Sequence, residues 1–184
     1  MKFTKGYWMN LPGVTNTDAV QVREVKVEND RVYLYTVPYH ADMRAMGGPL
    51  LEMYISSPQP DIIRTEAYHF MGSNQKMPAF ELNDAHCALE VENTETTVTI
   101  KSGNTKLVIG KNPCSFDYYY KDKKLTSIGN RFGNAMISTI STPDGNYMRA
   151  QMNLDIGEKV YGLGERFTPY VKNGQTVETW NEDG

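Results

Sequence analysis

Residues 146–155 read NYMRAQMNLD, and this stretch decides the fold class. Every second residue is apolar: Met148, Ala150, Met152 and Leu154. The residues between them carry polar atoms: Tyr147, Arg149, Gln151 and Asn153. Because side chains along a strand alternate between its two faces, this pattern predicts a half-buried β-strand with the apolar face turned inward.

Most of the remaining chain follows the same period of two. Segments rich in β-branched and aromatic residues predict strands at 31–37, 51–55, 61–70, 96–102, 105–110, 115–120 and 135–141. Turn signals separate several of them: Ser102-Gly103-Asn104, Lys121 to Lys124, and Pro143 to Asn146. No window longer than about two turns has a helical apolar stripe. Many short strands joined by tight turns predict an all-β fold, a large antiparallel β-sandwich.

One segment interrupts this pattern. Residues 38–50 contain Gly47-Gly48-Pro49, which is incompatible with a regular strand, so we expect a loop with at most one helical turn.

Composition narrows the class of protein without identifying it. The chain has 184 residues, enough for one domain or slightly more. Its net charge of -3 is unlike the clustered basic surface of a nucleic-acid-binding protein. No stretch is long and apolar enough for a transmembrane helix, and the N-terminus lacks the apolar core of a signal peptide. We therefore expect a soluble, cytoplasmic protein that contacts neither nucleic acid nor membrane, with Cys87 and Cys114 as free, buried thiols.

Several motifs that could carry chemistry are better explained structurally. His40, His69 and His86 lack metal-ligand spacing, so no metal is expected. Gly162-Leu163-Gly164 follows an apparent strand but lacks the third glycine and the helix of a dinucleotide-binding loop. We interpret it as a tight turn or as a close approach of the backbone at a sheet edge, and we expect no cofactor.

The tyrosine run 118–120 has two interpretations. It could form a platform on which a sugar stacks, but adjacent strand residues face opposite ways, so only Tyr118 and Tyr120 can share a face. Cross-strand packing is the favoured use. The adjacent carboxylates Glu182 and Asp183 diverge in an extended chain, so they are a poor candidate for the paired carboxyl groups, roughly 5 Å apart, of a retaining glycosidase. Either one could bind sugar hydroxyls beside Trp180.

Three sequence stretches near the C-terminus resemble one enzyme family. VYGLGERFT (160–168), KNGQT (172–176) and WNEDG (180–184) are similar to glycoside hydrolase family 31, especially its bacterial α-xylosidase and α-glucosidase branch. The opening MKFTKGYWMNLPGV also resembles the start of those enzymes. The similarity covers the whole chain, strongly at both ends and more loosely between them.

The resemblance implies a domain arrangement. Residues 1–184 would form the incomplete N-terminal β-sandwich, of the galactose-mutarotase-like supersandwich type, of a retaining α-glycosidase. The catalytic aspartates would lie on a (β/α)₈ barrel downstream, which takes roughly 250 residues. We therefore expect the sandwich to be truncated at Gly184, and the 184 residues alone to be inactive and to contain no catalytic residue.

The resemblance also implies the site residues. Asp183 matches the aspartate that hydrogen-bonds substrate hydroxyls near the scissile bond, and Trp180 and Asn181 precede it in the same loop. Glu182 stands where arginine is often found in the family, so the resemblance does not decide between specificity for xylose and specificity for glucose. The expected partners are an oligosaccharide or xyloside substrate, the protein's own barrel and, in the full-length enzyme, further copies of itself.

Two other functions are compatible with a β-sandwich. One is a free-standing carbohydrate-binding module, which would bind sugar as 184 residues. The other is a structural or adhesive β-domain, for which an export signal or repeats would be expected, and neither is visible.

Overall fold

A computed structural model describes residues 3–5, 9–38, 50–69, 86–129 and 137–179 of the chain. The chain divides into two compact units. The larger unit is Pro12–Asn153, and the smaller one combines Met1–Leu11 with Leu154–Gly184. The described part of the chain contains no helix that could span a membrane.

In the described part of the larger unit the strands form three antiparallel sheets, which confirms the predicted all-β fold. The first sheet comprises, in spatial order, β4 (Gln21–Val27), β5 (Arg31–Val37), β6 (Leu51–Ser56) and β7 (Arg64–Tyr68). The second comprises β12 (Lys123–Ile128), β11 (Cys114–Tyr120), β10 (Thr105–Lys111), β9 (Thr97–Ser102) and β8 (Glu90–Asn93). The third comprises β14 (Gly145–Ala150), β13 (Ile137–Thr142) and β3 (Thr15–Asp18).

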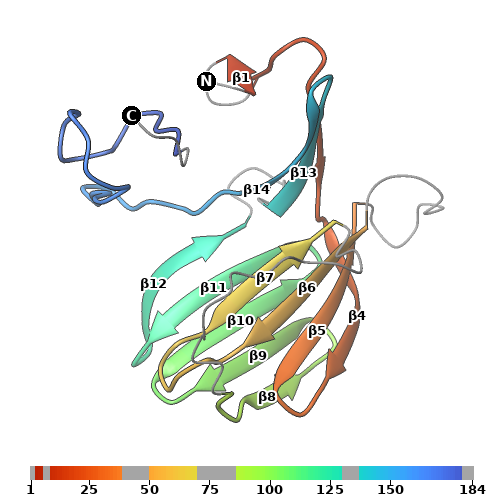
Figure 1. The fold of residues 1–184 in the computed structure, drawn as a ribbon. Coiled ribbons are helices and arrows are strands. Elements are labelled where there is room, and N and C mark those ends of the chain that lie inside the picture. The colour runs from red at the N-terminus through yellow and green to blue at the C-terminus, as the bar shows by residue number, and fades with distance from the viewer. Residues whose placement is uncertain (1–2, 6–8, 39–49, 70–85, 130–136, 180–184) are drawn as a thin grey trace, which may run out of the picture. The chain divides into compact units, whose positions relative to one another are not determined.

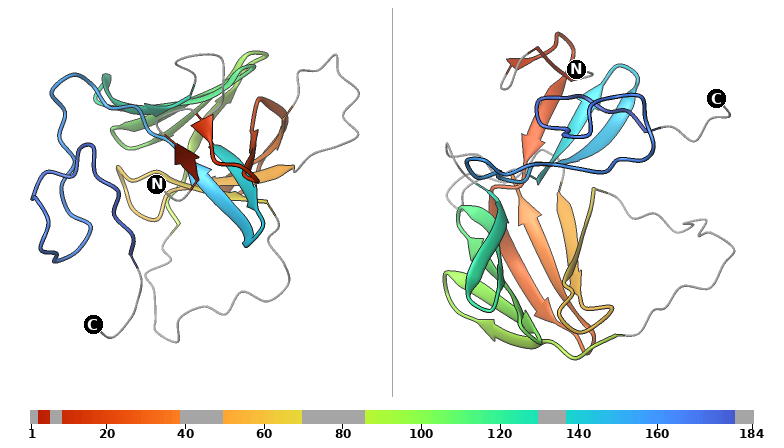
Figure 2. Two further views of the ribbon diagram at one scale, coloured as in Figure 1. Left: turned by 90° about the horizontal axis from the view of Figure 1, so that it is seen from above. Right: turned by 90° about the vertical axis from the view of Figure 1, so that its left-hand side faces the viewer.

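The first two sheets form the two layers of the sandwich (Figures 1 and 2). Alternate side chains of both layers enter one apolar core, including Val32, Leu34, Met53 and Ile55 from the first sheet and Val98, Ile100, Leu107, Ile109 and Phe116 from the second. All nine are at most 1% exposed. Burial of this apolar surface is the main force that holds the layers together.

Polar contacts also join the two layers. The hydrogen bonds that connect them include Ser57 Oγ with Ser102 Oγ (2.6 Å), Thr105 Oγ1 to Asp61 O (2.6 Å) and Cys114 N to Val20 O (2.7 Å). The carboxylate of Asp61 additionally accepts a hydrogen bond from the backbone N–H of Asn104. These bonds are directional, so they fix how one sheet lies on the other.

The predicted turns form where the sequence places them. Gly103 has a φ of 56° in the turn between β9 and β10, where glycine is favoured. Lys121 and Asp122, with φ values of 46° and 63°, reverse the chain between β11 and β12. Pro143 and Asp144 separate β13 from β14. The predicted loop 38–50 lies almost wholly outside the described residues.

The strand predicted from NYMRAQMNLD forms, but its buried face is wrong. In β14 the half-buried side chains include Tyr147 and Arg149, whereas Met148 is 42% exposed. Arg149 tolerates this position because its Nε donates to Ser138 Oγ at 3.0 Å and its guanidinium lies 3.5 Å from the carboxylate of Asp18. The strand also ends at Ala150, and only an isolated bridge at Met152 follows.

Of the smaller unit, the structure describes a short hairpin and one long segment. β1 (Thr4–Lys5) pairs with β2 (Met9–Asn10). Residues 154–179 contain no strand, so the strand expected before Gly162 does not form.

Candidate functional site

The predicted substrate-binding residues Trp180, Asn181 and Asp183, with Glu182 between them, lie outside the described residues. Their role therefore stays a prediction. The structure does describe residues 154–179, which lead directly to them and include the VYGLGERFT and KNGQT motifs. We call residues 154–179 the approach segment.

The approach segment is organised around a buried lysine. Lys172 is only 7% exposed, and its ammonium group donates to Thr168 Oγ1 at 2.7 Å and to the carbonyl oxygen of Pro169 at 2.9 Å. Its backbone N–H donates to the carbonyl oxygen of Val160 at 2.8 Å. A buried ammonium group is costly unless hydrogen-bonded, so these acceptors fix the chain path between Val160 and Lys172. The sequence interpretation missed this role, because an isolated lysine in a polar stretch resembles a surface residue.

Asn173 and Gln175 extend this network. The side-chain oxygen of Asn173 accepts from the N–H of Val160, and its amide nitrogen donates to the carbonyl of Glu158, at 2.8 and 2.9 Å. Gln175 Nε2 donates to the carbonyl of Val171 at 2.8 Å. The KNGQT motif thus contributes three side chains that hold an irregular backbone without strands.

The Gly162-Leu163-Gly164 motif forms a tight turn, as expected. All three residues have left-handed backbones, with φ values of 97°, 67° and 82°. Arg166 Nε donates to the carbonyl oxygen of Leu163 at 2.9 Å, which stabilises the one non-glycine residue in this conformation. The glycines therefore serve the path of the chain.

The approach segment exposes an unusual amount of apolar surface. Its large apolar side chains are exposed by 45% to 111%: Leu154, Ile156, Tyr161, Leu163, Phe167 and Tyr170. Ile156 and Phe167, at 104% and 111%, are as accessible as in an extended chain. Single exposed apolar residues are common, but six within seventeen consecutive positions form an apolar surface of the kind found at interaction sites.

The larger unit has an apolar groove of about 760 Å³ between β7, β12 and β14. Its lining includes Tyr118, Leu125, Ile128, Met148 and Met152, of which Leu125 and Met152 are more than half exposed. Three residues of the apolar face predicted for 146–155, Met148, Ala150 and Met152, therefore line an open groove instead of the core.

The three tyrosines of the run 118–120 lie in different surroundings. Tyr118 packs against the core, its hydroxyl lies 3.0 Å from Thr65 Oγ1 of the other sheet, and burial raises its pKa. Tyr118 and Tyr120 both line the groove, as the alternation predicts for a shared face. Tyr119 lies elsewhere, with the Lys106 ammonium 5.0 Å from its ring centroid. Tyr118 thus packs against the core and the other layer, whereas the sequence favoured packing between neighbouring strands.

The two cysteines differ from each other. Both are free thiols, as predicted, but only Cys114 is buried, whereas Cys87 is half-buried. Burial raises the pKa of Cys114 to about 12, which leaves it protonated and unreactive at neutral pH. Among the residues that the structure describes, no group of three or more His, Cys, Asp or Glu side chains could hold a metal ion.

Comparison with known proteins places the chain in a family. Residues 52–184 match the family model described as the glycosyl hydrolase 31 N-terminal galactose mutarotase-like domain. The α-xylosidase XylQ of Lactiplantibacillus pentosus is 31% identical over 191 residues, covering 100% of this chain and 24% of that protein. An α-xylosidase of Emericella nidulans is 31% identical over 205 residues, covering 100% of this chain and 26% of that protein. The chain thus spans about a quarter of the length of these curated relatives.

Solved structures show the same fold at lower sequence identity. The cycloalternan-forming enzyme of Listeria monocytogenes superimposes with a TM-score of 0.69 and 19% identity, covering 96% of this chain and 15% of that one. A GH31 dextranase of Flavobacterium johnsoniae gives a TM-score of 0.68 and 16% identity, covering 91% of this chain and 19% of that one. With the motifs, the sandwich and the family match in agreement, the chain belongs to the glycosyl hydrolase 31 N-terminal galactose mutarotase-like domain family.

Proposed function

We propose that this chain is the non-catalytic N-terminal domain of a longer retaining α-glycosidase, an α-xylosidase or α-glucosidase that removes terminal α-linked sugars in the cytoplasm. The longer protein would continue past Gly184 into a (β/α)₈ barrel that carries the catalytic carboxyl groups. Two α-xylosidases that are 31% identical along the whole chain support this reading, and they are about four times its length.

The observation that carries the proposal is the exposed apolar surface of the approach segment. Ile156 and Phe167 have no apolar cover, although the segment is well fixed by the hydrogen bonds of Lys172 and Asn173. A fixed backbone that presents bare apolar side chains is typical of one half of an interface. The downstream barrel is the partner that we propose for it.

The loop after the approach segment would then contribute to substrate binding. In this proposal the carboxylate of Asp183 accepts hydrogen bonds from sugar hydroxyls, and Trp180 and Asn181 shape the loop around it. None of the three acts on the reacting bond. Their contribution to the reaction would be binding and orientation of an oligosaccharide or xyloside.

Activity measurements on two forms of the protein test the proposal. The 184-residue chain should not hydrolyse an aryl α-xyloside or α-glucoside, whereas the longer protein should hydrolyse at least one, with retention of anomeric configuration. Turnover by the 184-residue chain, after controls for host enzymes, would overturn the assignment. So would a downstream sequence that encodes no barrel.

A further inference from the structure

A second cavity in the larger unit, of about 430 Å³, lies where the three-stranded sheet meets the end of β7. The strand register explains its lining. Thr139 pairs with both Thr17 and Met148, and Ser141 pairs with both Thr15 and Asn146, so all six side chains share one face of the sheet. This face, which lines the cavity, carries four hydroxyl groups and a carboxamide.

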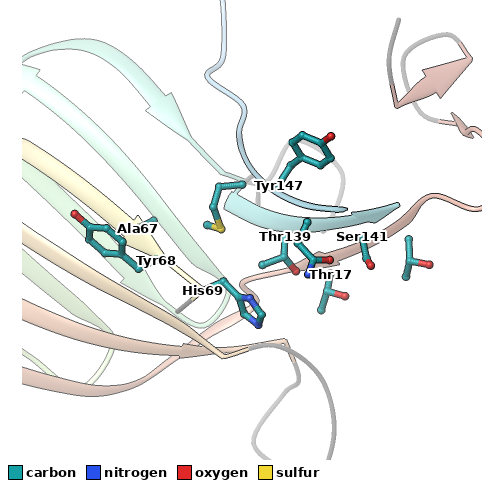
Figure 3. A pocket seen from close by; sticks show the side chains of 10 residues that line it. Thr17, Ala67, Tyr68, His69, Thr139, Ser141 and Tyr147 are labelled. Atoms are coloured by element: carbon teal, nitrogen blue, oxygen red, sulfur yellow. The ribbon is translucent and has the colours of Figure 1, made fainter. Parts of the chain in front are cut away.

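The end of β7 supplies the opposite wall. His69 follows β7 directly and lies two residues after Ala67, so the alternation places both on the same side. Figure 3 shows the His69 ring on the same side of the ribbon as Thr17, Thr139 and Ser141, whereas the ring of Tyr147 lies on the other side. The cavity is therefore bounded by hydroxyls, an amide and an imidazole.

The hydrogen-bonding capacity of this wall is unused. The side chains of Thr17, Thr139, Ser141, Asn146 and His69 make no hydrogen bond to any other residue that the structure describes. Thr139 is the most enclosed of them, because the residue is only 8% exposed. Its Oγ1 is open to the cavity, where a ligand can satisfy it.

The lining also defines the ligand. No Asp, Glu, Lys or Arg borders the cavity among the described residues, so no charge is available to pair with an ionic ligand. Hydroxyl, amide and imidazole groups both donate and accept hydrogen bonds, which matches a molecule that carries several hydroxyl groups of its own. Ala67 and Met148 provide apolar contact beside them. The volume is in the lower part of the range for ligand pockets, roughly 300–1,000 Å³, and suits a small ligand.

We propose that this cavity binds one pyranose unit of a neutral carbohydrate. The site uses only residues of Pro12–Asn153, whereas the function proposed above rests on the approach segment and the chain beyond it. Either proposal can therefore fail while the other holds. With about ten non-hydrogen atoms in a pentose, the affinity should lie in the millimolar range.

The test is an NMR titration of the isotope-labelled 184-residue chain with D-xylose and with D-glucose, using inorganic phosphate as the charged control. At least one sugar should shift the amide signals of Thr17, Thr139 and Ser141 in a saturable way, and phosphate should not. Absence of such shifts up to roughly 50 mM, well above a millimolar dissociation constant, would overturn the proposal. Shifts confined to other residues would also overturn it.

Variants then tie binding to the wall. Thr139→Val removes one hydroxyl and should weaken binding roughly 2- to 12-fold, the effect of losing a neutral hydrogen bond. Thr99→Val is the matched control, because Thr99 lies on β9 outside the cavity, and it should bind as the parent does. If Thr139→Val does not fold, the exposed Ser141→Ala replaces it. Unchanged binding by a folded cavity variant would refute the site.

Discussion

Replacing Phe167 by alanine tests whether the approach segment is an interface. In the 184-residue chain Phe167 is 111% exposed, so its removal costs no buried contact and should change stability by no more than about 0.5 kcal/mol. In the longer protein the same ring would be buried. An aromatic side chain buries roughly 150–250 Å², which at about 25 cal/mol/Å² corresponds to about 4–6 kcal/mol as an upper estimate.

The surrounding residues would relax into part of the space left by the ring, and the alanine methyl group would stay buried. The expected loss of docking free energy in the longer protein is therefore about 3 kcal/mol. This loss would act locally, on the docking of the approach segment. Backbone amides of residues 154–179 should therefore exchange with deuterium about 150-fold faster in the variant, since 1.36 kcal/mol corresponds to a factor of ten. In the 184-residue chain the same amides should exchange at the parent rate.

Hydrogen exchange followed by mass spectrometry on peptides from this segment measures both cases. Leu107→Ala is the control. Because Leu107 is fully buried in the sandwich, this substitution should destabilise both forms of the protein by about 2–5 kcal/mol. Equal exchange of Phe167→Ala and parent in the longer protein would show that no partner covers Phe167. A large effect in the 184-residue chain would contradict the exposure on which the reasoning depends.

Three further outcomes are expected. Asp183→Ala in the longer protein should lower kcat/KM by about 10- to 150-fold, the loss of a charged hydrogen bond of roughly 1.5–3 kcal/mol; near-complete loss rescued by azide would make Asp183 catalytic instead. Because burial raises the pKa of Cys114 from 9.0 to about 12, its contribution to stability is complete below pH 9 and is lost as pH rises toward 12. Its thiol should react with a disulfide reagent only in denaturant. Reaction in the native state at pH 8 would contradict its burial. Gly103→Ala should lower the free energy of unfolding by more than the roughly 1–2 kcal/mol of left-handed strain, because its Cβ would meet the Asp61 carboxylate. Gly174→Ala is the control, because Gly174 has a similar φ and open space around it, so this variant should show the strain alone. Equal losses of unfolding free energy in the two variants would refute the contact with Asp61.

The sequence predicted most strands of the sandwich because the period of two is a local signal. RVYLYTV was predicted at 31–37, and β5 has the same bounds. The strand β4 was not predicted, because a register shift between Val22 and Glu24 breaks the alternation, leaving Val22 buried and Val27 57% exposed. A bulge depends on the partner strand and has no signature in a single sequence.

The face of β14 could not be predicted from its own residues. Alternation shows which side chains lie together, but the side that is buried depends on the strand's neighbours. Arg149 lies inward because Ser138 and Asp18, remote in sequence, supply its acceptors. Met148, the next residue before it, is 42% exposed and lines the groove.

The candidate sites were predicted to different degrees. The motifs around Gly162 and Asn173 identified the approach segment, but its hydrogen bonds follow no period and could not be derived. The hydroxyl cavity was missed, although its signal is present: Thr139 and Ser141 lie two residues apart in ISTIST (137–142), as Thr15 and Thr17 do in TNT (15–17). Only the pairing of β13 with β3 brings these two short runs together.

The polar contacts between the two layers have a consequence for how this fold diverges. Apolar packing is tolerant, so a core can exchange one set of aliphatic side chains for another if the total volume is kept. Directional bonds such as those of Ser57, Asp61 and Cys114 fix the alignment of the sheets independently of which residues fill the space between them. Mutational drift can therefore replace core residues one by one without letting the sheets slide. A saturation library should accordingly accept many apolar substitutions at Ile100 or Leu107, but few replacements at Asp61.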